Sequence, residues 1–230
     1  LLAGTKDAPQ TVWGSETGVL PNFVNGTGGS DPFEFAMAAA TSNIYHMKGA
    51  KQVYVMTYDK EFAIDGGADS PLTPTNLLIK ELTNYGTKDT VPPLLIGNEL
   101  LFVTRHGKKL RAPSYDFNAD KWVAQDISII AAHLVDVGIV EMAYQAEPLS
   151  IVWVVTTDGK LLSITYDTEQ NVVAWAQHTT DGLFKSVVVI PYNDTDQVWV
   201  AVERNIGAVA HTFTEVLDPA LNTDSCVTDT

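Results

Sequence analysis

The stretch that decides the fold is IVWVVTTDGKLLSITYDTEQNVVAWAQH, which runs from Ile151 to His178. It contains three alternating apolar runs, IVWVVT, KLLSITYD and NVVAWAQH, which are separated by Asp158-Gly159 and by the polar run Thr168–Asn171. Alternation with a period of two, bounded by turn-forming residues, is typical of antiparallel strands. We therefore expect a three-stranded meander, which needs further sheets to cover its two faces and its open edges.

Related stretches recur along the chain. VTRHGKKL at Val103–Leu110 matches VTTDGKLL at Val155–Leu162, a spacing of 155 minus 103, or 52 residues, and VWVV at Val152 returns as VWVA at Val198. Four-stranded units at about this spacing are what a β-propeller requires, because each blade buries its faces only against its neighbours. The sequence predicts an all-β, β-propeller-like array of four-stranded antiparallel blades with one short helix; a two-sheet sandwich is the structural alternative.

The expected elements fall into five sets along the chain. Strands are predicted at Leu1–Gly4, Gln10–Gly14, Phe33–Met37, Ile44–Met47, Gln52–Thr57, Glu61–Ile64, Asn76–Leu82, Pro93–Ile96, Glu99–Thr104, Lys108–Asp116, around Trp122, and at Ile139–Ala143, Ile151–Thr156, Lys160–Asp167, Asn171–His178, Lys185–Ile190, Gln197–Val202 and Val209–Val216. The run after Ser30-Asp31-Pro32 could also start a helix, but its alternation favours a strand. The one helix is predicted over Ile127–Val137, between an Asp126 cap and the stop at Gly138.

The domain organisation follows from these sets. Residues 1–216 are expected to form the propeller region, with about five full or partial blades, and residues 217–230 to begin a linker or a further domain. The chain starts in the apolar pair Leu1-Leu2, and Asn222–Thr230 shows no folding pattern. Because propellers need at least about four blades, we expect the chain to be a fragment of a longer subunit.

Composition limits the classes of partner. Of 230 residues, 45% are hydrophobic, which indicates a globular core, and 14 Lys plus Arg stand against 28 Asp plus Glu, for a net charge of -14. Such an acidic chain is a poor binder of nucleic acid, because it has few cations to neutralise phosphates. The single cysteine, Cys226, excludes an intrachain disulfide and a thiolate metal site. No apolar run reaches the length of a membrane span.

Motifs that carry chemistry are missing from the sequence. The five histidines show no ligand spacing, and there is no Gly-x-Ser-x-Gly elbow, P-loop or dinucleotide fingerprint. Three arginines, Arg105, Arg111 and Arg204, are too few and too dispersed to suggest a glycan-cleaving cluster. We therefore predict no enzyme activity, no catalytic, cofactor-binding or metal-binding residues, and no cofactor.

Two acidic loops have competing interpretations. TTDGKLLSI resembles the aspartate box of sialidase propellers without its closing aromatic residue, so a type I′ hairpin turn at Asp158-Gly159 is favoured. The loop Asp65–Asp69 could offer oxygen ligands to Ca²⁺, but it is short of them, and a solvated loop is favoured.

A succession of strings resembles one protein family over nearly the whole chain. The strings are PQTVWGSETG (Pro9–Gly18), PLTPTN (Pro71–Asn76), LLIGNELLFVTRHGKKLR (Leu94–Arg111), AAHLVDVGIVEMAYQAEPLSIVWVV (Ala131–Val155), TYDTEQNVVAWAQH (Thr165–His178) and LNTDS (Leu221–Ser225). In this order they resemble the nozzle, or tail tubular B-like, proteins of short-tailed bacteriophages. Cys226 departs from the small residue usual there, with no functional consequence.

The resemblance implies a structural virion protein located in the phage tail. It implies a β-propeller within a longer subunit, with several copies in a ring around the channel for DNA ejection, in contact with the head-to-tail adaptor and with tail fibre or needle proteins. The genome would pass without specific binding, because an acidic lining repels phosphates. The alternative is a carbohydrate-binding or glycan-degrading propeller that acts on the host surface.

Overall fold

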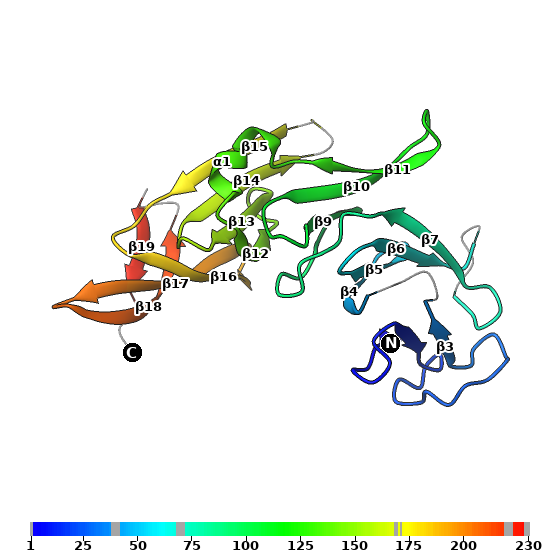
Figure 1. Ribbon diagram of the computed structural model, residues 1–230. Coiled ribbons are helices and arrows are strands. Elements are labelled where there is room, and N and C mark those ends of the chain that lie inside the picture. The colour runs from blue at the N-terminus through cyan, green and yellow to red at the C-terminus, as the bar shows by residue number, and fades with distance from the viewer. Residues whose placement is uncertain are drawn as a thin grey trace.

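The computed structural model describes residues 2–37, 42–67, 72–167, 170, 172–218 and 223–227. Almost all of its regular structure is antiparallel β-sheet, as predicted, and one short helical segment interrupts the strands. The five sheets follow one another in chain order from the N-terminal to the C-terminal end (Figure 1). The all-β class is therefore confirmed.

The first sheet has three strands and each of the other four has four. The strands are β1 (Leu2–Ala3), β2 (Thr11–Gly14) and β3 (Phe33–Ala36); β4 (Ile44–Gly49), β5 (Val53–Thr57), β6 (Glu61–Asp65) and β7 (Leu78–Thr83); β8 (Leu94–Ile96), β9 (Glu99–Val103), β10 (Leu110–Asp116) and β11 (Lys121–Asp126); β12 (Ile139–Gln145), β13 (Ile151–Thr156), β14 (Leu161–Asp167) and β15 (Val172–His178); β16 (Leu183–Tyr192), β17 (Thr195–Ile206), β18 (Val209–Asp218) and β19 (Thr223–Val227). In every sheet the spatial order of the strands is their chain order, so each is a simple meander.

Consecutive sheets pack face to face through alternate residues of their second strands. In β9, Leu100 and Phe102 pack against the β4–β7 sheet, whereas Leu101 and Val103 pack against the β12–β15 sheet. The same alternation in β5 and β13 joins the remaining neighbours, so that four apolar layers connect the five sheets. Because side chains of a strand alternate between faces, the continuous apolar runs of the sequence mark strands that are covered on both faces.

The edges by which the sheets approach one another differ along the chain. The first strand of the fourth sheet, β12, contacts the first strands of both neighbouring sheets, β8 and β16. Between the second and third sheets, the last strands β7 and β11 make the contact instead. The contacts among the last three sheets therefore involve their first strands, whereas the second and third sheets are in contact through their last strands.

Polar side chains reinforce the contacts between sheets. The Tyr166 hydroxyl donates to Glu99 Oε2 at 2.6 Å, between the fourth and third sheets. Glu141 Oε2 accepts from the backbone nitrogen of Val187 at 2.9 Å, in the edge strand β16 of the fifth sheet. These two bonds link consecutive sheets through polar groups.

The helix is shorter than the predicted Ile127–Val137. A 3₁₀ turn at Ile129–Ala131 leads into α1, which spans only Ala132–Val135. Asp126 belongs to β11, and the Ile127 nitrogen donates to Leu110 O at 3.0 Å, so the sheet extends into the expected first turn. Ile129 and Ile130 are exposed, so the apolar pattern predicted a longer packed helix face than the structure contains.

Two regions with open sequence interpretations are strands. Phe33–Ala36 forms β3, which pairs with β2, so the strand is confirmed over the helix. Within the stretch 217–230, Thr223–Val227 forms β19, which pairs with β18. The fifth sheet therefore has four strands, like the three sheets before it.

Candidate functional site

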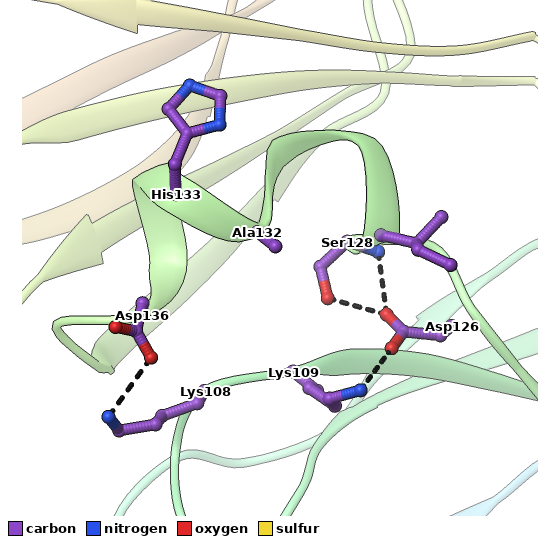
Figure 2. Close-up of a pocket in the computed structure, with 8 residues that line it drawn as sticks. Lys108, Lys109, Asp126, Ser128, Ala132, His133 and Asp136 are labelled. Atoms are coloured by element: carbon purple, nitrogen blue, oxygen red, sulfur yellow. Dashed lines mark hydrogen bonds and ion pairs between the residues drawn. The ribbon is translucent and has the colours of Figure 1, made fainter.

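A shallow groove of about 420 Å³ lies beside the short helix (Figure 2). Its lining residues are Lys108, Lys109, Asp126, Ser128, Ile129, Ala132, His133 and Asp136. The turn before β10 supplies the two lysines, Asp126 ends β11, and the segment between β11 and β12 supplies the other residues.

Ion pairs neutralise the charges of this groove. Lys108 Nζ lies 3.1 Å from Asp136 Oδ1, and Lys109 Nζ lies 2.9 Å from Asp126 Oδ2. Burial acts to raise the pKa of Asp126, but hydrogen bonds from Ser128 and Lys109 outweigh it and lower this pKa below its usual value. Figure 2 shows the His133 ring pointing away from these pairs. Both lysines of the groove are therefore held in ion pairs with aspartates of the protein.

A larger hollow, of about 860 Å³, lies beside the second sheet. It is lined by Ala50, Lys51, Gln52, Val53, Tyr54, Ile64, Asp65, Gly66, Gly67, Leu72, Lys80, Asn98 and Trp122. Asp65 accepts from Lys80 Nζ at 2.7 Å and from the Gly67 nitrogen at 2.9 Å. The bond from Lys80 holds the pKa of Asp65 below its usual value. Both oxygens of the Asp65 carboxylate therefore accept hydrogen bonds from the protein. Residues 68 and 69 of the loop that could bind Ca²⁺ lie outside the described residues.

Glu61 is a buried acid in the second sheet. It sits at the start of β6 and is fully buried. Its carboxyl group accepts from the Thr83 hydroxyl at 2.7 Å, the Tyr85 nitrogen at 3.3 Å and the Thr87 hydroxyl at 3.3 Å. Burial raises the pKa of Glu61 from 4.5 to about 7, against the opposing effect of these bonds. Glu61 therefore titrates near neutral pH.

The donors to Glu61 belong to the connection between the second and third sheets. The Thr87 nitrogen also donates to Thr57 O at 2.9 Å, and the Lys88 nitrogen donates to Val103 O at 3.0 Å. Glu61 thus holds a segment that is bonded to both sheets. The sequence signal for Glu61 is weak: this acid directly precedes the apolar run Phe62–Ile64, which is buried in the same strand.

The turn at Asp158-Gly159 is a hairpin turn, as favoured, but its type differs from the prediction. A type I′ turn needs positive φ at both central residues, and the non-glycine residues with positive φ in the described chain are Asp120, Asn193 and Ala208. The Thr156 nitrogen donates to Lys160 O at 3.0 Å, so the loop has three residues and ends with Gly159 at φ +78°. One extra residue lets the glycine alone supply the left-handed conformation.

The related turn before β10 shares this geometry. Gly107 has φ +77°, and its nitrogen donates to Thr104 O at 2.7 Å, as the Gly159 nitrogen does to Thr156 O at 3.0 Å. The Asp158 carboxylate accepts from the Thr156 hydroxyl and pairs with Lys160 at 2.8 Å. The sequence match at Val103 and Val155 therefore corresponds to a structural repeat, and the aspartate supports its own turn.

Gly159→Ala is expected to lower the free energy of unfolding by about 1–3 kcal/mol. Alanine is strained at φ +78°, and its Cβ would lie 2.8 Å from the Leu183 side chain. Gly97→Ala is the matched control, because Gly97 has φ +58° but no neighbour within 4 Å of the added Cβ. Chemical denaturation should show the larger loss for Gly159→Ala; equal losses would contradict the contact with Leu183.

The histidines and arginines lie apart. His46 Nε2 lies 3.0 Å from Lys88 O, and His178 Nε2 lies 2.9 Å from Ser163 Oγ. The arginines contact, in chain order, the ring of Tyr58, the ring of Tyr85 and the buried carboxylate of Glu215. Over the described ranges, no three His, Cys, Asp or Glu side chains gather into a possible metal site.

An exposed apolar sheet face is the surface that sequence reasoning missed. In β17, Val198, Val200 and Val202 are buried against the fourth sheet, whereas Trp199 and Ala201 point to the opposite face and are half-buried. Val188 and Ile190 of β16 are 48% and 46% exposed. We call the surface formed by Val188, Ile190, Trp199, Ala201 and Val216 the terminal face.

No protein-family model matches the chain, and no curated protein matches it. Within the described residues, none of the helices is long and apolar enough to cross a membrane.

Proposed function

We propose that the chain is a structural, non-enzymatic protein of a phage virion, in which it forms part of the tail nozzle ring around the DNA ejection channel. The observation that carries the proposal is the series of sheets stacked face to face, four of them four-stranded meanders. The succession of strings that resemble the nozzle proteins of short-tailed phages supports the same role. Scaffolding needs such a rigid, repeated architecture and no reacting side chains.

The blade arrangement is part of this proposal. In a propeller, consecutive meanders stack around an axis that lies near their first strands. Contacts of β12 with both β8 and β16 favour this arrangement for the last three sheets. Between the second and third sheets, the contact is made by the last strands β7 and β11, which this arrangement alone does not account for.

Charge supports a role beside DNA without binding to it. The net charge is -14, and a basic surface is needed to neutralise phosphates. Acidic side chains along a conduit would repel the genome and let it pass. The partners in this role are other copies of the chain, the head-to-tail adaptor, and fibre or needle proteins.

Immunogold labelling of purified particles tests the proposed location. An antibody against the chain should place gold at the tail, on the axis below the head. Label confined to the head shell would contradict the proposal. Glycan hydrolysis by the purified chain would instead favour the alternative, an enzyme that acts on host surface sugars.

A further inference from the structure

A short segment at the end of the second sheet is bonded to both the second and the third sheet. It runs from Thr83, the last residue of β7, to Lys88, and we call it the junction segment. The Thr87 nitrogen donates to Thr57 O of the second sheet at 2.9 Å, and the Lys88 nitrogen donates to Val103 O of the third sheet at 3.0 Å. The junction segment therefore ties these two sheets together.

Glu61 is the side chain that the junction segment encloses. It lies on the same side of β6 as Ala63, which packs in the layer between the second and third sheets. The hydroxyls of Thr83 and Thr87 and the Tyr85 nitrogen all donate to its carboxyl group. Because Glu61 is fully buried, its carboxyl group becomes hydrated only if part of this enclosure moves.

These donors are neutral, and the charged or titratable side chains around the junction segment have other partners. With the partner in brackets, they are Asp59 (Thr57 hydroxyl), Lys60 (Glu81), Lys88 (Ile139 O), Arg105 (Tyr58 ring), Arg111 (Tyr85 ring) and His46 (Lys88 O). Apart from the Tyr54 phenol, the side chains that β5 and β9 contribute to this layer are apolar. Within the described residues, the Glu61 carboxyl group thus has hydrogen-bond donors but no cationic partner. A buried carboxylate in such surroundings is costly.

We propose that Glu61 and the junction segment form a pH-sensitive latch between the second and third sheets. The latch is closed while the carboxyl group is neutral, and ionisation favours a locally open state in which the segment separates from Glu61 and admits water. The pKa of about 7 that burial gives Glu61 places this change near neutral pH. The latch does not depend on the proposed function, and it assigns the response to one segment instead of the whole fold.

The expected size of the response follows from proton linkage. In the open state Glu61 is hydrated and has the ordinary glutamate pKa of 4.5, whereas its pKa in the closed state is about 7. Opening therefore releases a proton, and rising pH favours it. From about pH 6 to about pH 8 the equilibrium constant for opening should rise about 10-fold. At higher pH it should change little, because the carboxyl group is then ionised in both states.

Native-state hydrogen exchange of the whole chain tests the latch. The amides of Thr87, Lys88 and Arg105 bond the junction segment to its neighbours, and their protection factors should fall about 10-fold between about pH 6 and about pH 8. Low concentrations of urea should change this exchange little, because a local opening exposes little surface. The amide of Leu162 in the fourth sheet is the reference for global opening. If the junction amides depended on urea as steeply as Leu162, the opening would be global and the latch would be overturned.

Two substitutions separate Glu61 from other titrating groups. Glu61→Gln cannot ionise, so protection of the junction amides should stay constant over the same pH range. Thr83→Val removes one donor to the carboxylate and so raises the pKa of Glu61 further, and the loss of protection should continue to a higher pH before it levels off. Glu81→Gln is the matched control, because Glu81 is an acid of β7 whose side chain is 45% exposed, and it should behave like the wild type. Loss of protection that persists in Glu61→Gln, or wild-type protection that is unchanged with pH, would overturn the proposal.

Discussion

Trp153→Ala is expected to lower the free energy of unfolding by about 3–5 kcal/mol. Trp153 lies between the fourth and fifth sheets among Val155, Leu161 and Phe184. Its indole nitrogen donates to Gln145 Oε1 at 3.0 Å. Removing the ring leaves a cavity between the fourth and fifth sheets, and the buried Gln145 side chain loses one hydrogen bond. Chemical denaturation of the whole chain measures the loss.

Trp199→Ala is the matched control for that experiment. Trp199 occupies the repeated position in the next sheet, but it lies on the terminal face and is half-buried. Because the Trp199 ring is already partly in contact with solvent, its replacement should cost only about 1–2 kcal/mol. Equal losses for the two variants would contradict the stacking of the fifth sheet on the fourth.

Glu61 is expected to make stability fall as pH rises from about 4.5 to about 7. The pKa of an ordinary glutamate side chain is 4.5, and that of Glu61 in the folded protein is about 7. Between these values the folded chain keeps a proton that the unfolded chain has lost, so rising pH favours unfolding. The full difference corresponds to roughly 3 kcal/mol, and above about pH 7 this contribution no longer changes.

Glu61→Gln isolates this contribution, because glutamine keeps a similar shape and cannot ionise. The free energy of unfolding, measured by urea titration between pH 4.5 and 8, should fall with pH in the wild type and vary much less in the variant. Asp65, Asp126 and Asp158 have pKa values lowered below 3.8. Their stabilising contributions are lost only as pH falls through those lower values, outside this window. Parallel curves for the two proteins would contradict the assignment.

The strands could be predicted because the sequence contains both features that a hairpin strand needs, alternating apolar residues and a turn-forming residue at the end. Ile151–Thr156 and Leu161–Asp167 alternate and are separated by a turn that needs glycine, and both form strands. The matching strings at Val103 and Val155 also correspond to equivalent turns, in which Gly107 and Gly159 both have positive φ. At these positions the alternation of apolar residues and the turn-forming residues indicate the same structure, and such agreement allows the strands to be predicted from the sequence.

Features that depend on three-dimensional context were not predictable. The apolar pattern at Ile127–Val137 predicts a helix, but it does not show that the Ile127 nitrogen donates a hydrogen bond to Leu110 O and so extends the sheet. In the sequence Glu61 is an ordinary acid at the start of a strand, and only the fold brings the hydroxyls of Thr83 and Thr87 to its carboxyl group. Likewise, Trp153 and Trp199 have nearly identical sequence neighbours, and only the stacking order leaves one covered and the other open.

Cryo-electron microscopy of the intact particle tests the central claim most directly. The account predicts that density for this chain lies in an axial tail ring, with consecutive meander sheets stacked around the channel and identical copies side by side. Density for this chain located outside any axial tail ring would contradict the account.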